Sequence, residues 1–257
     1  MNDIVSPFEI GIIGGNGAMG KWFAAFFRKN GYTVHIADQK TVMTIPELAG
    51  RCAVVIVSVP IDVTESVIRE AGTNMGPDGL LMDLTSLKTV PVSAMLQATP
   101  SEVIGLHPLF GPDTASIRDQ NIVVCPARGT RWLSWLTALL KDNGAHIVET
   151  TPERHDEMMS VIQGLNHLNT IMMGLTIQDA AIAPDELDLY STPAFRTKRE
   201  MIKKTFHQNP AMYAEIIANN PHIGKILHIY EANLARLKKL INDQDIDSLT
   251  ELMKSQS

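Results

Sequence analysis

The sequence predicts an α/β fold, in which a doubly wound parallel sheet is followed by a smaller all-α domain. Two observations support this prediction. Short apolar runs alternate with helical patterns in the first half of the chain, and after Pro152 only helical periods remain. Fully apolar strands between helices are typical of a parallel sheet covered on both faces. We therefore expect one domain at residues 1–151 and a second at residues 152–257.

The first strand and helix frame a glycine-rich turn. An apolar run over residues 8–13 leads into a helical pattern over residues 19–30. The glycines between them fit the template G-x-G-x-x-G, which bends the chain, lets a pyrophosphate approach the backbone and packs helix against strand. The first helical turn also favours an anion there. We therefore predict a Rossmann-type dinucleotide site that includes Gly15, Asn16, Gly17, Ala18, Met19 and Gly20.

The second strand is predicted at residues 32–37, after Gly31 closes the helix. Asp38 follows it, about 20 residues past the glycine turn, where a carboxylate would accept hydrogen bonds from an adenosine ribose. A negative charge there favours NAD over NADP, because it would repel a 2′-phosphate. The alternative is that Asp38 is an ordinary turn residue.

The remaining elements of this domain follow in order. A weak helix lies between Pro46 and Gly50, and better helices are expected at 63–70 and 132–140. Strands are expected at residues 53–57, 79–83, 102–105, 122–125 and 146–148.

Ligands of such sheets bind beyond the carboxyl ends of the strands. Ser58, Val59 and Pro60 follow one strand and are predicted to pass beneath a ribose, although a plain strand-to-helix turn is equally compatible. Thr85, Ser86 and Lys88 follow the next strand. We assign Thr85 to the cofactor, and Ser86 and Lys88 to a polar group of the substrate. Ordinary loop residues are the alternative.

His107 lies in the run Gly105-Leu106-His107-Pro108-Leu109-Phe110-Gly111-Pro112-Asp113, which we expect to form a stiffened loop at the cofactor edge. A neutral imidazole there could accept a hydrogen bond from a substrate hydroxyl and take its proton as hydride leaves. The alternative is that His107 has a structural role and forms a hydrogen bond with the loop backbone.

The helical half shows two apolar patterns. One stripe is apolar enough that we expect its helix to be buried on most sides: Met158, Ile162, Leu165, Met172 and Leu175. A second has the 4-3-4-3-4 spacing of a seam that packs against another helix: Ile223, Leu227, Tyr230, Leu234, Leu237 and Ile241. Docking on the first domain or on a second subunit is expected.

This half also supplies cations. Arg196, Arg199 and Lys203 share one helical face, with Lys204 at its border. A solvated basic face is the usual explanation, but local positive charge in a chain of net charge −6 suits a carboxylate substrate. His155 and His167 are expected to be core or surface histidines.

Composition narrows the function classes. The net charge of −6 and the pI of about 5.7 argue against nucleic acid and against an anionic membrane as partners. Cys52 and Cys125 are expected to be buried free thiols. No metal-ligand spacing is present. Residues 1–7 lack the features of a secretory signal, so we expect a cytoplasmic protein.

Together these motifs resemble those of the prephenate dehydrogenase family, the oxidoreductases of tyrosine biosynthesis that include arogenate dehydrogenases. The resemblance extends over nearly the whole chain and is most specific at the His107 run. Its other parts are residues 12–20, 55–61, 83–88, 153–156, 163–167, 193–196 and 209–217.

The resemblance implies a Rossmann domain, a helical domain that forms a homodimer, and an active site between them. It implies NAD-dependent oxidative decarboxylation of prephenate to 4-hydroxyphenylpyruvate. By the same resemblance, His107 contacts the ring hydroxyl and Ser86 supports it near the nicotinamide. Lys88, His167 and Arg196 match positions that lie near the substrate or orient the site.

One departure concerns the substrate carboxylate. The family usually has an arginine where this chain has Lys204, and an ammonium group keeps the charge but loses the bidentate fork. Either Arg199 or Lys203 therefore assists in binding the carboxylate, or the affinity is lower, or the substrate differs. Arogenate and the 4-amino analogue of prephenate are the alternative substrates. Another β-hydroxyacid or imine dehydrogenase is a wider alternative, and a non-catalytic NAD-binding sensor is an alternative of another class.

Overall fold

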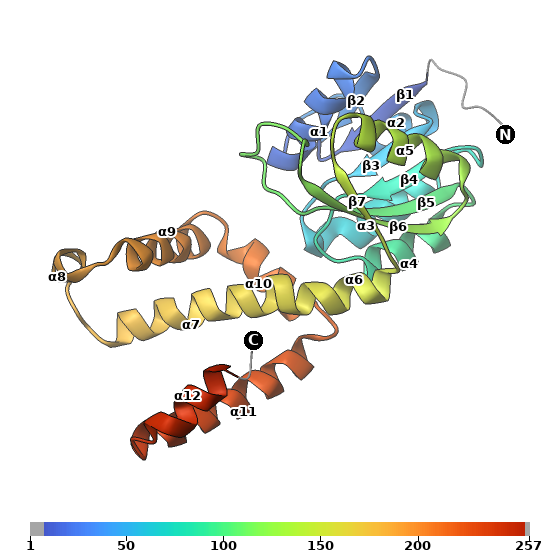
Figure 1. Cartoon of the computed structure of the whole chain (residues 1–257). Coiled ribbons are helices and arrows are strands. Elements are labelled where there is room, and N and C mark those ends of the chain that lie inside the picture. The colour runs from blue at the N-terminus through green and yellow to red at the C-terminus, as the bar shows by residue number, and fades with distance from the viewer. Residues whose placement is uncertain (1–7, 255–257) are drawn as a thin grey trace. The chain divides into compact units, whose positions relative to one another are not determined.

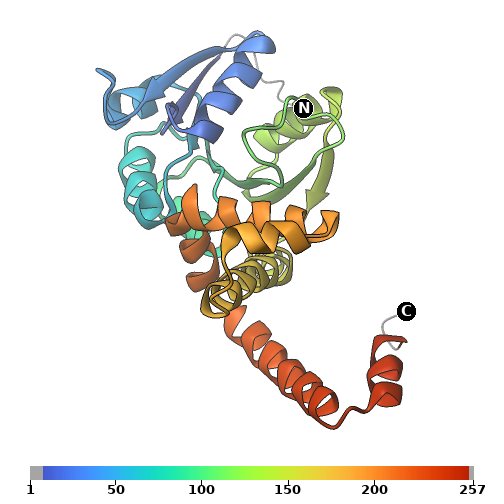
Figure 2. The same ribbon diagram turned by 90° about the vertical axis from the view of Figure 1, so that its left-hand side faces the viewer.

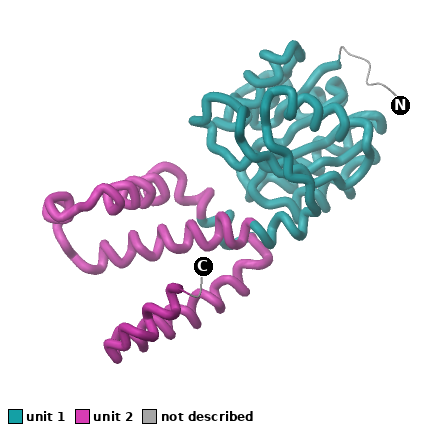
Figure 3. Tube along the Cα trace, in the orientation of Figure 1, with its two compact units in different colours: residues 1–158, 214–219 teal, residues 159–213, 220–257 magenta. Residues whose placement is uncertain are grey.

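The computed structural model describes residues 8–254, so the expectation about residues 1–7 falls outside the described residues. The chain forms two compact units (Figure 3). Unit 1 comprises Met1–Met158 and Ala214–Asn219, and unit 2 comprises Met159–Tyr213 and Asn220–Ser257. Most of helix α6 (Pro152–Met159) therefore belongs to unit 1. The domain boundary at residue 151 stays a prediction.

Within the described residues, unit 1 contains a seven-stranded sheet of order β2-β1-β3-β4-β5-β6-β7 (Figure 1). The fold class predicted from the sequence is confirmed. The strands lie where the apolar runs predict them, with ends that differ by up to three residues: β1 (Glu9–Ile13), β2 (Thr33–Ala37), β3 (Val54–Val57), β4 (Leu80–Asp83), β5 (Glu102–Pro108), β6 (Asn121–Arg128) and β7 (His146–Glu149).

The expectation of an entirely parallel sheet is wrong at one pair. Strand β6 runs antiparallel to β5, and all the other neighbours are parallel. Residues 109–120 join β5 to β6 without a helix. A parallel return needs a crossover, usually a helix, whereas an antiparallel return does not. Sequence periodicity could not show this, because residues 122–125 of β6 form the same kind of buried apolar run as the parallel strands β3 and β4.

Helices cover both faces of the sheet. On one face α1 (Ala18–Lys29) and α5 (Arg131–Asp142) pack on Ile12 and Ile56, and on the other α2 (Ile45–Arg51), α3 (Ile61–Gly72) and α4 (Thr89–Ala98) pack on Val55 and Val57. Alternate residues of each strand point to opposite faces, which is why the central strands β3 and β4 are buried along their whole length, whereas the edge strand β7 is largely exposed. Helix α4 has no counterpart among the elements expected from the sequence.

Unit 2 is helical, as predicted. Its elements are the π-helix η1 (Ser160–Leu165), α7 (Asn166–Asp179), α8 (Pro184–Tyr190), α9 (Pro193–His207), the first residues of α10 (Pro210–Ala218), α11 (Ile223–Asn242) and α12 (Ile246–Lys254). Helices α11 and α12 follow one another at the red end of the chain (Figure 2). Within residues 8–254, no helix combines the length and apolar character that crossing a membrane requires.

The expected burial of the first apolar stripe is wrong for this chain by itself. Helix α7 contains no buried residue among those described, and Ile162, Met172 and Leu175 are 40–51% exposed. The seam on α11 is also open, with Leu234 52% and Ile241 61% exposed. Helix α7 packs on α9, and η1 packs on α11. These contacts leave much of the apolar stripe and of the α11 seam exposed.

Candidate active site

The glycine turn after β1 is held tightly in place. Gly14 has a φ of +77°, and a Cβ built on it would lie 2.2 Å from the carbonyl oxygen of Ser58. A Cβ on Gly20 would lie 2.4 Å from the carbonyl oxygen of Gly14. The sharp bend is thus at Gly14, one residue before the position that the template assigns, and Gly15 is instead required for packing beside Ile36. Gly20 allows helix α1 to approach the backbone of Gly14 and Gly15 closely, so its neighbour is the turn rather than the strand that the template implies.

A cavity of about 830 Å³ opens at this turn. It lies at the point where the strand order reverses between β1 and β3, which is the ligand site of open α/β sheets. Six of the predicted cofactor residues line it: Asn16, Gly17, Asp38, Ser58, Val59 and Pro60. The other predicted cofactor residues do not line it. Gly15 and Gly20 are buried, Met19 packs against the core, and the backbone N–H of Thr85 forms a hydrogen bond with Asp83.

Asp38 closes one end of this cavity. Its carboxylate accepts hydrogen bonds from the backbone N–H of Asn16 at 3.0 Å and of Gln39 at 2.8 Å. Each carboxylate oxygen can accept more than one hydrogen bond, so Asp38 can also accept from sugar hydroxyls. The cavity, the bare backbone at Gly17 and this carboxylate suit a dinucleotide. Asn16, Gly17 and Ser58 would hold it together with Asp38.

Gly17→Ala tests this site. Gly17 has an ordinary φ of −66°, and its added Cβ would meet only the carbonyl oxygen of Gly14 within 3.4 Å, at 3.2 Å. We expect a melting temperature within about 4 °C of the parent, because the backbone needs little change. We expect NAD affinity to fall at least about tenfold, because the methyl group occupies the space of the ligand.

Isothermal titration with NAD measures the effect of Gly17→Ala, and Gly76→Ala is the matched control. A Cβ on Gly76 would have no neighbour within 4 Å, and Gly76 is remote from the cavity lining. Unchanged NAD affinity in Gly17→Ala would remove the cavity from the proposed cofactor site.

The register of β5 places His107 at the carboxyl edge of the sheet. Gly105 pairs with Asp83, the last residue of β4, so His107 lies two residues beyond the end of that neighbour. His107 belongs to the strand itself and pairs with Val123 of β6. The predicted stiffened loop is therefore wrong in its position: it begins after Pro108, and the imidazole is fixed by the sheet.

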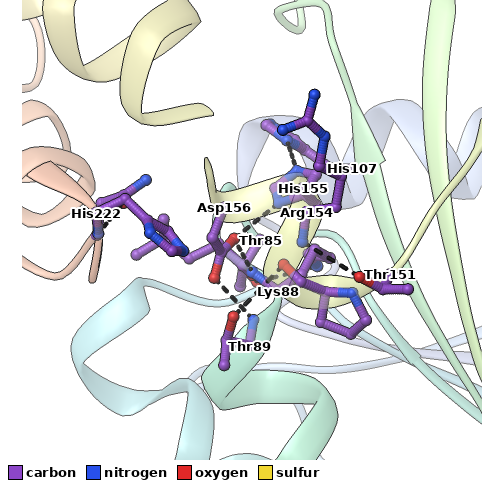
Figure 4. A network of polar contacts seen from close by, with 12 residues as sticks. Thr85, Lys88, Thr89, His107, Thr151, Arg154, His155, Asp156 and His222 are labelled. Atoms are coloured by element: carbon purple, nitrogen blue, oxygen red, sulfur yellow. Dashed lines mark hydrogen bonds and ion pairs between the residues drawn. The ribbon is translucent and has the colours of Figure 1, made fainter. Parts of the chain in front are cut away.

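His107 begins a chain of buried polar contacts (Figure 4). Its Nδ1 lies 2.8 Å from Nε2 of His155, and Nδ1 of His155 lies 2.7 Å from Oδ1 of Asp156. Asp156 also accepts hydrogen bonds from the backbone N–H groups of Lys88 at 2.8 Å and Thr89 at 2.9 Å. Helix α6 thus carries an aspartate and a histidine, and the histidine contacts the imidazole of His107 on β5.

The direction of these hydrogen bonds follows from Asp156. Burial raises the pKa of Asp156, but the hydrogen bonds from His155, Thr89 and Lys88 outweigh it and hold that pKa below its usual range. An ionised carboxylate only accepts, so His155 carries its proton on Nδ1. When both rings are neutral, Nε2 of His155 accepts from Nδ1–H of His107. Nε2 of His107 then carries the lone pair of a base.

Burial keeps His107 neutral. Its pKa lies well below the ordinary 6.5, first because of desolvation and then because of His155 and Lys88, while Asp156 opposes the shift. In the unfolded chain the same imidazole titrates near 6.5. Between the two pKa values the unfolded state therefore binds more protons, and stability falls as the pH falls below about 6.5.

We expect this loss of stability to reach at most about 1.4 kcal/mol per pH unit, the limit for one proton. Urea unfolding at pH 7.5, 6.5 and 5.5 measures it. His107→Asn should show a shallower dependence in this window. Asp156 contributes in a different window, because its stabilisation is lost only as the pH falls through its lowered pKa. Equal slopes for parent and variant would contradict the assignment.

Lys88 is fully buried, which differs from the substrate contact expected for it. Its ammonium group pairs with Asp83 and donates to the carbonyl oxygen of Leu106 at 3.0 Å. The backbone N–H of Thr85 also donates to Asp83 at 3.0 Å, and the hydroxyl of Thr85 donates to the carbonyl oxygen of Leu87 at 2.8 Å. This cluster joins the end of β4 to the residue before His107, so it fixes the strand that carries the imidazole. Ser86, between the two, is half-buried.

The predicted cations of unit 2 lie together on α9. Arg196, Arg199 and Lys203 line a pocket of about 510 Å³. Lys204 lines an adjacent pocket of about 410 Å³. Arg199 also forms an ion pair with Asp188 of α8. The structure thus groups the arginines as the helical spacing predicts, and Lys204 lies at the border.

His167 lies elsewhere in unit 2, on α7. It is half-buried, and burial lowers its pKa. Its ring meets that of Tyr213 edge-on, with centroids 4.8 Å apart. The predicted contact with the substrate stays a prediction.

The roles of His155, Asp156 and Asp83 were not predicted from the sequence. His155 and Asp156 were noted only as part of a family motif, and His155 as an ordinary core or surface residue. Adjacent titratable residues in the first turns of a helix directly after a strand were the available signal. The contact of His155 with His107, 48 residues earlier, was not visible in any local pattern.

Comparison with known proteins agrees with this geometry. A family model described as prephenate dehydrogenase, nucleotide-binding domain, matches residues 25–149. A second, described as prephenate dehydrogenase, dimerization domain, matches residues 151–255. The probable arogenate/prephenate dehydrogenase of Methanocaldococcus jannaschii is 31% identical over 95% of this chain and 59% of its own length. The T-protein of Haemophilus influenzae is 36% identical over 81% of this chain and 55% of its own length.

Solved structures share the fold. Prephenate dehydrogenase from A. aeolicus, in complex with hydroxyphenyl propionate and NAD+, has a TM-score of 0.80 at 19% identity, covering 98% of this chain and 96% of that one. Arogenate dehydrogenase from Synechocystis has a TM-score of 0.73 at 21% identity, covering 96% of each chain.

The chain spans a little over half the length of three curated relatives that it matches, the two described above and the T-protein of Enterobacter agglomerans. Both halves of the described fold are nevertheless matched in order, the sheet domain by one family model from residue 25 onward and the helices by the other. The chain therefore belongs to the prephenate dehydrogenase family of oxidoreductases.

Proposed function

We propose that this protein is an NAD-dependent prephenate dehydrogenase, which converts prephenate to 4-hydroxyphenylpyruvate and carbon dioxide. The observation that supports it most is the neutral, buried imidazole of His107 at the carboxyl edge of a sheet that carries a dinucleotide-type cavity. Family membership makes a cyclohexadienyl substrate the natural choice.

In this proposal His107 is the general base. Its Nε2 lone pair accepts the proton of the ring hydroxyl as the carbon beneath it is oxidised. Bound NAD would supply the hydride acceptor. The oxidised ring then loses its carboxylate as carbon dioxide and becomes aromatic, and the phenolate that forms can take the proton back from His107. The reaction is therefore neutral in protons, so His107 needs only to hold one proton temporarily.

Three features support NAD as the cofactor. The carboxylate of Asp38 lines the cavity, the backbone at Gly17 is bare, and the helix α1 begins at the cavity edge. A 2′-phosphate would meet the negative charge of Asp38, so we propose NAD rather than NADP. Among the relatives, one from Schizosaccharomyces pombe is described as a probable NADP(+)-dependent prephenate dehydrogenase, so turnover is to be measured with both NAD and NADP.

We propose that the basic face of α9 binds the carboxylates of the substrate. Arg196 and Lys203 line the pocket of about 510 Å³ on this face, and Arg199 forms an ion pair with Asp188. Lys204 replaces the arginine usual in the family. An ammonium group binds a carboxylate through a point charge rather than a fork, so Lys204 fits a weaker or less selective carboxylate contact.

The open apolar faces of unit 2 support a homodimer. Leu234, Leu237 and Ile241 of α11 are 36–61% exposed. Exposed apolar stripes of this kind mark protein interfaces. We propose that a second copy covers them, in agreement with the dimerization-domain family model over residues 151–255.

Turnover of three substrates side by side tests the proposal. Prephenate, arogenate and 4-amino-4-deoxyprephenate are each supplied with NAD and then with NADP, and reduced cofactor is followed. We expect the highest kcat/KM for prephenate with NAD. A clear preference for either amino compound would replace the substrate assignment, since relatives with those descriptions are also similar to this chain.

A further inference from the structure

The His155–Asp156 pair on α6 has a geometry that a packing role alone does not require. Both side chains are buried, at 1% exposure each, yet both are polar. Each is placed within hydrogen-bond distance of the next: Asp156 to His155 at 2.7 Å and His155 to His107 at 2.8 Å. The chain ends on the imidazole that we propose as the base.

We infer that His155 and Asp156 are positioning residues for His107: they fix its proton on Nδ1 and stabilise the imidazolium that forms when Nε2 takes the substrate proton. This inference rests on the proposed function and adds two residues to it. It assigns no second proton transfer, because a hydrogen bond from His107 to His155 is sufficient to hold the charge.

Asp156 sets the order of the hydrogen bonds. Its two oxygens accept from the backbone N–H groups of Lys88 and Thr89, so the carboxylate is held rigidly at the start of α4. An ionised, rigid carboxylate requires a proton on Nδ1 of His155. Nε2 of neutral His155 can then only accept, which selects one of the two tautomers of His107. A histidine whose tautomer is fixed by its neighbour is the usual arrangement of a general base.

The charges around His107 oppose its protonation, which makes the pair useful. Burial and the charge of Lys88 before α4 disfavour a cation at His107, whereas the charge of Asp156 favours it. Lys88 is itself paired with Asp83 of β4. The hydrogen bond from His107 to His155, which Asp156 orients, therefore stabilises an imidazolium that the buried surroundings disfavour.

His155, rather than Asp156, is the residue to change, because Asp156 also holds the backbone at the start of α4. His155→Leu removes the acceptor for Nδ1–H of His107. His155→Gln places an amide oxygen near the position of Nε2 and can keep that acceptor. We expect kcat to fall roughly 10- to 100-fold in His155→Leu, the loss of one hydrogen bond to a charged group, with KM for prephenate and the affinity for NAD within about threefold. We expect His155→Gln to recover part of the loss.

Nitrogen-15 NMR of the free protein gives a readout that does not depend on activity. The ring signals of His107 are assigned by their absence in His107→Asn. In the parent protein at pH 7.5 we expect Nδ1 to carry the proton and Nε2 the lone pair. In His155→Leu we expect the proton of His107 to be distributed over both nitrogens or to move to Nε2.

Two results would overturn the inference: a His107 whose proton lies on Nε2 in the parent protein, or full kcat in a folded His155→Leu. The first does not require any variant of His155 to fold. If His107→Asn is inactive while His155→Leu is fully active, the pair fails and the proposed function stands. If no cyclohexadienyl substrate is oxidised, the proposed function fails, and the tautomer measurement still tests the hydrogen-bond order.

Discussion

His107→Asn should lower kcat for prephenate by roughly 10²–10⁴-fold, the range for a lost general base. In energy this is about 3–5 kcal/mol of transition-state stabilisation. The variant should still fold, because the amide nitrogen of asparagine can take the place of Nδ1 and donate to His155. It should also bind NAD normally, because His107 is not among the residues that line the cavity at the glycine turn.

Steady-state kinetics and NAD titration check this prediction, and His146→Asn is the matched control. His146 is exposed on β7, and its side chain lies 3.9 Å from Asp119 rather than near the His107 network. The control should keep turnover within about twofold. If His107→Asn also kept it, His107 would have no part in the chemistry, and Ser86 would become the next candidate.

Lys88→Met should lower the free energy of unfolding by about 3–5 kcal/mol, the cost of leaving one partner of a buried ion pair alone. Both Lys88 and Asp83 have no exposed surface. The methionine fills much of the space of the lysine stem but cannot neutralise Asp83, and Oδ1 of Asp83 already has no hydrogen-bond partner among the described residues. Urea unfolding measures the change.

Two further variants make this result specific to the buried charge. Adding Asp83→Asn to Lys88→Met should recover part of the stability, because the buried anion is removed. Lys29→Met, at an exposed position in the last turn of α1, should stay within about 0.5 kcal/mol of the parent. A loss below about 1 kcal/mol in Lys88→Met would show that water or a neighbouring group compensates Asp83, contrary to the role assigned here.

Much of unit 1 could be predicted from sequence because its signals are local. The glycine turn, the apolar strands and Asp38 each depend on residues close in the chain, and the structure places Asp38 and Gly17 on the same cavity. The position of the sharp bend was missed by one residue, because Gly14 and Gly15 are both glycines and either fits a tight turn.

The rest depends on contacts between distant residues. A lysine just after a strand is typical of a substrate contact. Lys88 is buried instead, because β4 and β5 bring Asp83 and the carbonyl oxygen of Leu106 beside its ammonium group. The backbone of Lys88 meets Asp156, 68 residues later. Similarly, the apolar stripe on α7 looks like a core helix, but its exposed side chains need a cover that this chain alone does not supply.

Oxidation of prephenate by the purified protein tests the central claim most directly. With NAD in excess, we predict NADH, carbon dioxide and 4-hydroxyphenylpyruvate in equal amounts, with turnover that disappears in His107→Asn. Tight binding of NAD with no NADH from prephenate, arogenate or 4-amino-4-deoxyprephenate would contradict the claim and would identify a nucleotide-binding sensor instead.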